Sequence, residues 1–179
     1  TATNDLTTQG TAGGDKFVPS RIGAGRVDVK NAASSNVIAF NKDDAGAVSV
    51  SFGVMEVPVN GSLTLTKDVT VENKHSLTSA TFTVAFASAL SLATPGVTFS
   101  ITDLAGAPVT SLTLAHGESK ELRVKVVANG ATMKHAMDTT MATVQVAAPR
   151  QYMTEAGGYL TLTPTSGQML RVPVYAVAR

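Results

Sequence analysis

The stretch YLTLTPTSGQMLRVPVY, at positions 159–175 of this 179-residue chain, decides the fold class. Apolar and polar residues alternate at 159–162, which is the period of a β-strand with one face in a core. Turn-forming residues follow at 164–167 (PTSG), and a second apolar run begins at Leu170. Two such runs on either side of a short turn predict an antiparallel hairpin.

The same pattern extends upstream as far as position 37. Short alternating segments rich in β-branched residues recur, with Gly, Asn, Asp and Pro between them. We expect strands over 37–40, 48–54, 63–71, 82–86, 97–101, 112–114, 122–126, 144–146, 159–162 and 170–175. Because each strand has one polar and one apolar face, two sheets must pack together to hide the apolar faces. Residues 36–179 are therefore predicted to form an all-β, antiparallel β-sandwich.

The first 35 residues have a different character. Residues 7–14 are rich in glycine, and residues 21–33 are RIGAGRVDVKNAA. Gly23 and Gly25, one residue apart, predict a tight turn in which backbone lies close to backbone. Asp28 is placed to cap a short helix over the following residues. A segment with so few apolar residues cannot bury a core alone, so we expect a loop and short helix preceding the sandwich.

Residues 23–29, GAGRVDV, resemble the segment that closes the catalytic domain of subtilisin-like serine proteases, and TAT at 1–3 resembles the end of that domain's last core helix. The strand motifs at 65–73, 81–84, 112–126 and 158–176 are similar, in order and spacing, to the fibronectin-III-like sandwich that often follows this domain. One departure is Phe82, where these modules usually have tyrosine.

The resemblance implies that 1–35 is the tail of a subtilisin-like α/β catalytic domain and 36–179 a fibronectin-III/Ig-like sandwich. The chain is then the non-catalytic C-terminal region of a secreted or cell-surface serine endopeptidase. It stabilises the catalytic domain or positions protein substrates. The resemblance assigns the contact with the catalytic domain, or with a fragment of it, to Gly23, Gly25, Arg26, Val27 and Asp28.

The chain has no complete active site of this family. The Asp, His and Ser segments of the triad are missing, including the GTSMA segment that carries the serine at a helix start. Ser166 shares only a Thr-Ser pair with that segment, and its flanks are predicted strands. We therefore assign no catalytic residue here, and whether the parent is an enzyme depends on the resemblance.

Composition argues against several other kinds of protein and site. Charged residues make up 15% of the chain and the net charge is +1, which does not suit binding to nucleic acid. The uncharged run at 77–102 alternates apolar residues with Thr and Ser, so no membrane span is expected. The chain has no cysteine, which rules out disulfides and thiolate metal sites.

No metal or cofactor site is predicted. Turns hold the three histidines and the candidate calcium ligands, which are His75, His116, His135, Asp43, Asp44 and Asp138. Their spacing lacks the regular ligand pattern and the bidentate acid that such sites require. The GAG turn also lacks the third glycine and the preceding strand of a nucleotide-binding loop. Asn60-Gly61-Ser62 is a formal glycosylation sequon, but Asn-Gly is also a favoured hairpin dipeptide, and we favour the turn.

A different class stays open as the alternative: a surface adhesin or filament subunit built from an Ig-like sandwich. The even charge and the strands rich in Thr and Val suit it equally. Residues 1–35 separate the two hypotheses, because an adhesin has no reason to carry them in this form. If they pair as a donated strand with a neighbouring copy, the filament hypothesis is favoured. A carbohydrate-binding module is less favoured, because the chain has no Trp and three Tyr to form flat aromatic platforms.

Overall fold

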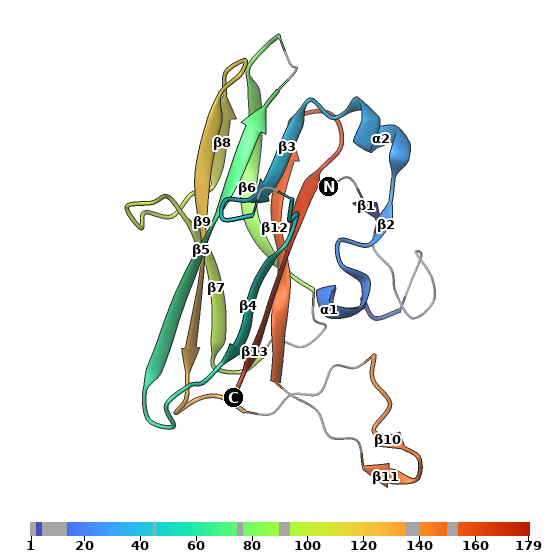
Figure 1. Ribbon diagram of the computed structural model, residues 1–179, viewed down its shortest axis with the longest axis vertical. Helices are drawn as coiled ribbons and strands as arrows, with labels where there is room; N and C mark the ends of the chain where they lie inside the picture. The colour runs from blue at the N-terminus through green and yellow to red at the C-terminus, as the bar shows by residue number, and fades with distance from the viewer. Residues whose placement is uncertain are drawn as a thin grey trace.

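Two β-sheets pack face to face in the computed structural model, as expected for the all-β sandwich (Figure 1). The structure describes residues 3–4, 14–44, 46–74, 77–89, 94–134, 140–149 and 154–179. The five-stranded sheet has the order β4-β13-β12-β6-β8 and the four-stranded sheet the order β3-β5-β9-β7. The predicted segments form β3 to β10, β12 and β13, so the alternating pattern was a reliable guide to the strands.

The sandwich strands have the following bounds. In the five-stranded sheet they are β4 (Val50–Met55), β6 (Ala80–Ser88), β8 (Ser111–Leu114), β12 (Thr154–Pro164) and β13 (Leu170–Ala178). In the four-stranded sheet they are β3 (Val37–Asn41), β5 (Ser62–Asn73), β7 (Val97–Thr102) and β9 (Ser119–Asn129).

Six shorter elements lie outside these two sheets. They are α1 (Pro19–Ile22), α2 (Val29–Ser34) and two small ladders, β1 (Thr3–Asn4) with β2 (Arg26–Val27) and β10 (Val144–Gln145) with β11 (Ala148–Pro149). Figure 1 shows α1, β2 and α2 beside β12 and β13, at the outer side of the five-stranded sheet.

One pairing is parallel, which the alternating pattern did not reveal. β3 pairs with β5 in one sheet, and the chain then crosses over residues 42–49 to pair β4 with β13 in the other. The crossover does not reverse the chain, so β4 runs in the same direction as β3 and meets β13 in parallel (Figure 1). The remaining sandwich ladders are antiparallel, as expected.

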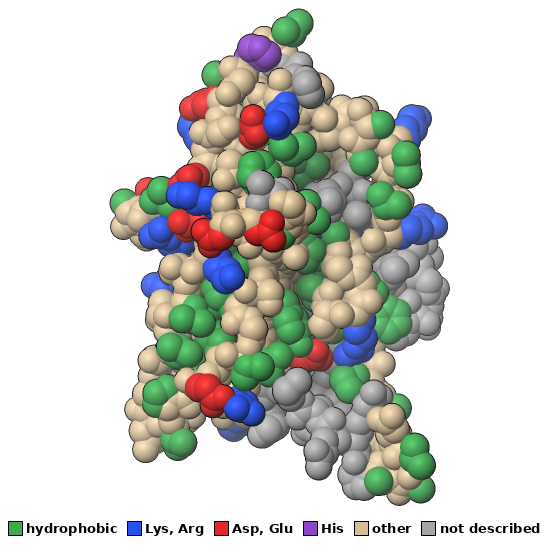
Figure 2. Space-filling model, in the orientation of Figure 1, with side chains coloured by type: hydrophobic (Ala, Val, Ile, Leu, Met, Phe, Trp, Pro, Cys, Tyr) green, Lys and Arg blue, Asp and Glu red, His purple; other side chains and the backbone are tan. Residues whose placement is uncertain are grey.

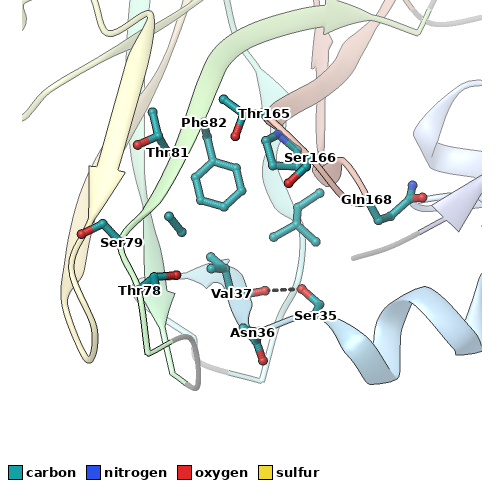
Figure 3. Close-up of a pocket in the computed structure, with 13 residues that line it drawn as sticks. Ser35, Asn36, Val37, Thr78, Ser79, Thr81, Phe82, Thr165, Ser166 and Gln168 are labelled. Atoms are coloured by element: carbon teal, nitrogen blue, oxygen red, sulfur yellow. Dashed lines mark hydrogen bonds between the residues drawn. The ribbon is translucent and has the colours of Figure 1, made fainter.

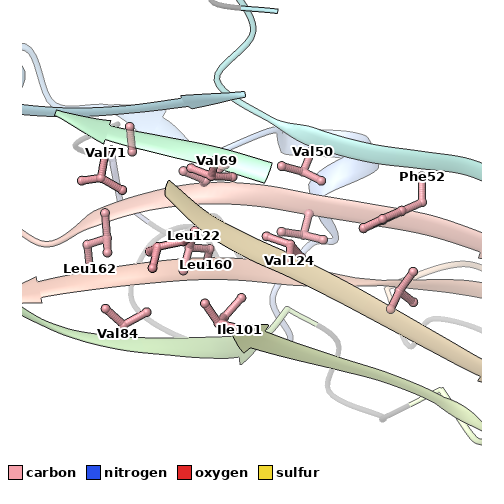
Figure 4. Close-up of a cluster of buried hydrophobic side chains, with 14 of the residues drawn as sticks. Val50, Phe52, Val69, Val71, Val84, Ile101, Leu122, Val124, Leu160 and Leu162 are labelled. Atoms are coloured by element: carbon pink, nitrogen blue, oxygen red, sulfur yellow. The ribbon is translucent and has the colours of Figure 1, made fainter. Parts of the chain in front are cut away.

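The core lies between the sheets and consists of the inward residues of every sandwich strand (Figure 4). Fully buried members include Val69, Val124, Leu160 and Val172. Phe86 and Phe99 stack at one end with ring centroids 4.7 Å apart. Burial of aliphatic side chains from two facing sheets supplies the main favourable free energy of this fold.

Asn73 ends β5 and is completely buried. Its side-chain Nδ2 donates to the carbonyls of Thr78 and Ala115, at 3.2 and 3.1 Å, and more weakly to that of Leu114. Its backbone C=O accepts from the N–H of Gly117 at 2.9 Å. One amide therefore ties the end of β5 to the start of β6 and to the turn between β8 and β9.

The expected turns are largely confirmed. Residues 165–169 join β12 to β13, and Gly117 lies in the turn between β8 and β9. Asn60-Gly61 also lies in a turn, closed by the Gly61 N–H and the Pro58 C=O at 3.0 Å. It is not a hairpin turn, because it joins β4 of one sheet to β5 of the other. The dipeptide specifies the bend but not which strands pair.

Replacing Asn73 with Ala should destabilise the sandwich by about 1–3 kcal/mol, because buried carbonyls lose their donor. Urea unfolding would measure the loss. Asn60→Ala is the matched control, since Asn60 is exposed in its turn and should change stability by less than about 0.5 kcal/mol. Equal effects of the two substitutions would contradict this role of Asn73.

Candidate interaction surface

The β12–β13 hairpin is buried on both faces. Nearly every residue of β13 is buried, although the strand alternates between inner and outer positions. Val172 faces the core, whereas the neighbouring Arg171 lies on the outer side and is only 4% exposed. A sheet with one solvated face would leave such an arginine in water. Residues 14–35 lie along this outer side, and Val18, just before α1, is itself buried (Figure 1).

Glu155 of β12 is the polar centre of this interface. Its carboxylate accepts hydrogen bonds from Ser20 Oγ at 3.0 Å and from Tyr175 Oη at 2.8 Å. Arg21 Nη2 lies 3.5 Å from the same carboxylate. Burial, and then the hydrogen bond to Glu155, raise the pKa of Tyr175 to about 12. The phenol is therefore a protonated donor under physiological conditions.

A second contact joins the turn after α1 to the hairpin. Tyr159 Oη donates to the backbone C=O of Gly23 at 3.3 Å. The guanidinium of Arg171 lies over the ring of Tyr159, 4.8 Å from its centroid. A cation over an aromatic face is attracted by the ring's electron density, and more so where water is excluded. The aromatic ring thus bridges a buried charge and the backbone of the N-terminal segment.

Asp28 caps α2, as predicted. Its carboxylate accepts from the backbone N–H of Asn31 at 3.1 Å and from Asn31 Nδ2 at 2.8 Å. The backbone hydrogen bond, followed by the side-chain one, lowers the pKa of Asp28. Asn31 Nδ2 also donates to Gln168 Oε1 at 3.2 Å. The cap therefore connects α2 to the turn between β12 and β13.

The GAG turn depends on backbone conformation. Gly23 and Gly25 have φ angles of +56° and +102°, which side-chain-bearing residues rarely adopt. A Cβ added to Gly23 would meet no atom within 4 Å. The sequence suggested that position 23 needs glycine because backbone approaches backbone there. In this chain the reason is instead the positive φ angle, which favours glycine. Contact of this turn with a further domain remains a prediction.

Of the other residues assigned to a domain contact, Arg26 and Val27 are exposed. Val27 is 64% exposed and the adjacent Val29 is 70% exposed, while Asp28 between the valines is half-buried. β2 pairs with β1 and belongs to neither sandwich sheet. The N-terminal segment is thus held on the sandwich through α1 and α2, while Val27 and Val29 lie in solvent beside the exposed Arg26 and Lys30. We name Val27 and Val29 the valine strip.

A pocket of about 310 Å³ opens where α2 leads into β3 (Figure 3). Its lining comes from 35–37, 78–82 and 164–170. Ser166 is among the lining residues, and those that the structure describes include no His, Asp, Glu or Lys. A serine without a neighbouring base is not an activated nucleophile. The hairpin-turn interpretation of Ser166 is confirmed by its position between β12 and β13.

The candidate metal ligands do not converge. Asp44 Oδ1 accepts from the backbone N–H of Gly46, and Asn41 Oδ1 accepts from that of Asp43, so this acidic stretch forms a turn. His116 lies in the turn between β8 and β9, while His75, His135 and Asp138 lie outside the described residues. Within the described ranges, no three His, Asp or Glu side chains are grouped to hold a metal ion.

Charges on the face in Figure 2 are mixed, with acidic and basic side chains close together. Asp68 and Arg123, paired across β5 and β9, form a bidentate salt bridge with 2.8 and 2.9 Å contacts. The hydrogen bonds from Arg123 lower the pKa of Asp68. Neither helix of the described chain has the length and hydropathy needed to cross a membrane.

Sequence reasoning missed the residues on the outer side of the hairpin, namely Glu155, Tyr159, Arg171 and Tyr175. One signal was available in Arg171, a charge at an outward position within an otherwise apolar strand. The alternating pattern shows which face of a strand is apolar, but not that a polar face is covered by another part of the chain.

No protein-family model and no curated protein matches the chain. Solved structures with similar folds include the CooA pilin subunit from enterotoxigenic Escherichia coli, with 14% identity and a TM-score of 0.44 over 80% of this chain and 97% of that one. A FixG-related protein from Vibrio parahaemolyticus has 12% identity and a TM-score of 0.42 over 80% of this chain and 94% of that one.

The secreted serine protease VesC from Vibrio cholerae is a third similar structure, with 12% identity and a TM-score of 0.42. The match covers 84% of this chain but 24% of VesC. Secreted-protease and pilin structures thus both occur among proteins with similar β folds, and similarity at this level does not distinguish their functions.

Tyr175 predicts a specific loss of stability in alkali. Because its pKa in the folded state is about 12, above the ordinary 10.0, the folded state binds the phenolic proton more tightly than the unfolded state. Its contribution is complete below about pH 10 and is lost as the pH rises to about 12. Urea unfolding at about pH 9 and about pH 11 should show a smaller alkaline loss for Tyr175→Phe than for the wild type. Identical losses would refute the assignment.

Proposed function

We propose that this chain is the non-catalytic C-terminal region of a secreted subtilisin-like serine endopeptidase. Residues 1–35 complete the catalytic domain, and the sandwich stabilises that domain. The resemblance of residues 23–29 to the family's closing segment motivates the proposal. The observation that carries it is the valine strip, which lies in solvent on a segment that Ser20, Arg21 and Asn31 attach to the sandwich.

The attachment of the segment explains how a sandwich could stabilise a neighbouring domain. Ser20 and Arg21 contact Glu155, and Asn31 contacts Gln168, so α1 and α2 are each held to the β12–β13 hairpin. A catalytic domain that ended in this segment would be joined to the sandwich through a packed interface and not through a flexible linker. Unfolding of the C-terminal end of the catalytic domain would then require breaking contacts with the sandwich.

The valine strip gives the proposed interface its favourable free energy. Complete burial of a valine side chain contributes about 1.5 kcal/mol or more. Val27 and Val29 obtain little of this within the chain, because most of each side chain is exposed. A catalytic domain that covers both would gain it. The positive φ of Gly25, immediately before Arg26, sets the direction in which the chain leaves the turn.

The alternative function, a surface adhesin or filament subunit, is supported by the sheet edges. β7 and β8 are outer strands of their sheets. An outer strand offers backbone donors and acceptors to an added strand from another chain, which is how many such assemblies form. The N-terminal segment argues for the protease, since it attaches to its own sandwich mainly through α1 and α2 and not as a strand of either sandwich sheet.

Isolation of the native protein from its producing culture distinguishes the two functions. An antibody against the sandwich would capture it, and a fluorophosphonate probe would label any active serine hydrolase in the captured material. We expect a labelled species, continuous with the chain or bound to it, whose peptides contain the Asp, His and Ser segments of a subtilisin-like domain. Multimers of the chain alone, without label, would establish the filament alternative.

Val27→Asp tests the interface itself. In the assembled protease this substitution should lower the melting temperature, because it places a charge in an apolar contact. In the isolated chain it should change stability by less than about 0.5 kcal/mol, since Val27 is exposed there. Val59→Asp is the matched control, as Val59 is 79% exposed and lies away from the segment, between β4 and β5. If both variants lower the melting temperature of the assembled protease, or if neither does, the valine strip is not the contact.

A further inference from the structure

The pocket beside α2 has the form of a small-molecule site. Three segments distant in sequence surround it: the start of β3, the start of β6 and the turn between β12 and β13 (Figure 3). Its volume of about 310 Å³ lies at the lower end of the range for small-molecule sites, about 300–1,000 Å³. A ligand the size of one or two sugar rings would suit such a volume better than a folded partner.

None of the described residues that line the pocket is charged. It consists of Ser35, Asn36, Val37, Thr78, Ser79, Ala80, Thr81, Phe82, Pro164, Thr165, Ser166, Gln168 and Leu170. Phosphates, carboxylates and cations are recognised by oppositely charged groups, since an unpaired charge loses its hydration without compensation. A neutral lining therefore selects a neutral ligand.

The lining is also divided into an apolar floor and a polar rim. Val37, Phe82 and Leu170 are buried and form the floor. Hydroxyl and amide side chains form the rim, and its exposed members are Asn36, Thr78, Ser79, Thr81, Thr165 and Ser166. A ligand that fits must present C–H groups on one side and several hydroxyl groups around its edge. A pyranose ring has this distribution.

We propose that this pocket binds a neutral saccharide, with its ring on the apolar floor and its hydroxyl groups on the rim formed by Asn36, Ser79, Thr165 and Ser166. This site is independent of the proposed protease parentage, since it is built from residues of this chain alone. Phe82 is 4% exposed and offers little stacking area, so hydrogen bonds provide most of the recognition. The absence of Trp platforms excludes flat carbohydrate surfaces but not a concave site.

Hydrogen bonds hold the rim in place before a ligand arrives. Gln168 Oε1 accepts from Asn31 of α2, and Thr78 C=O accepts from the buried amide of Asn73. Ser35 Oγ donates to the C=O of Val37 at 2.8 Å, a contact drawn in Figure 3. A rim that is already ordered loses less conformational entropy on binding, which favours affinity for a small ligand.

Titration of the isotope-labelled chain with neutral saccharides tests the proposal. The panel contains glucose, galactose, mannose, N-acetylglucosamine and their common disaccharides, and glucuronic acid serves as the charged comparison. We expect saturable amide shifts at Asn36, Ser79, Thr165 and Ser166 with at least one neutral sugar, with Kd about 1 mM because the buried site area is small. Binding of glucuronic acid should be weaker than that of glucose.

Two variants with matched controls complete the test. Asn36→Ala and Ser166→Ala should each weaken binding about fivefold, the effect of one lost hydrogen bond. Asn60→Ala and Ser100→Ala, at exposed positions outside the pocket, should leave Kd unchanged. The proposal is overturned if no sugar of the panel produces saturable shifts, or if rim and control variants bind alike. It is also overturned if the shifts appear with short neutral peptides in place of sugars.

Discussion

Burial of the β12–β13 hairpin on both faces is the constraint on which the rest of this structure depends. The inner face packs Leu160 and Val172 against the four-stranded sheet. The outer face carries Arg171, which could not remain buried without a cover. Residues 14–35 lie along that face, so the segment that differs most from a sandwich in sequence is part of what completes it.

Residues 14–35 make two further sets of contacts with the sandwich. Asp28 caps α2 and orders Asn31, which bonds to Gln168 at the pocket wall. Gly23 accepts a hydrogen bond from Tyr159, whose ring lies against Arg171. Two of the residues that resemble a protease's closing segment, Gly23 and Asp28, are therefore connected to the outer face of the β12–β13 hairpin and to the pocket wall.

The sequence predicted the strands well because period-two alternation directly reflects a half-buried sheet. It also predicted the Asp28 cap, since that contact spans only three residues. It did not predict the parallel β4–β13 ladder or the cover over Arg171. Both depend on contacts between distant positions, and a local pattern contains no information about which polar face meets another segment. Asn60-Gly61 shows the same limit, because the dipeptide predicted a bend but not its strands.

The contacts on the outer face of the β12–β13 hairpin are polar, and they bear on both the valine strip and the pocket. A partly buried polar network such as that of Glu155 adds little net stability compared with apolar packing, but it favours few arrangements, because each donor must meet its acceptor. Glu155 can satisfy Ser20, Arg21 and Tyr175 together only when α1 lies in one position. The valine strip and the pocket are linked through α2, because Asn31 of α2 donates to Gln168 of the pocket lining. Any partner that shifted α2 on covering the strip would change sugar affinity, and by linkage the sugar would change the partner's affinity by the same factor.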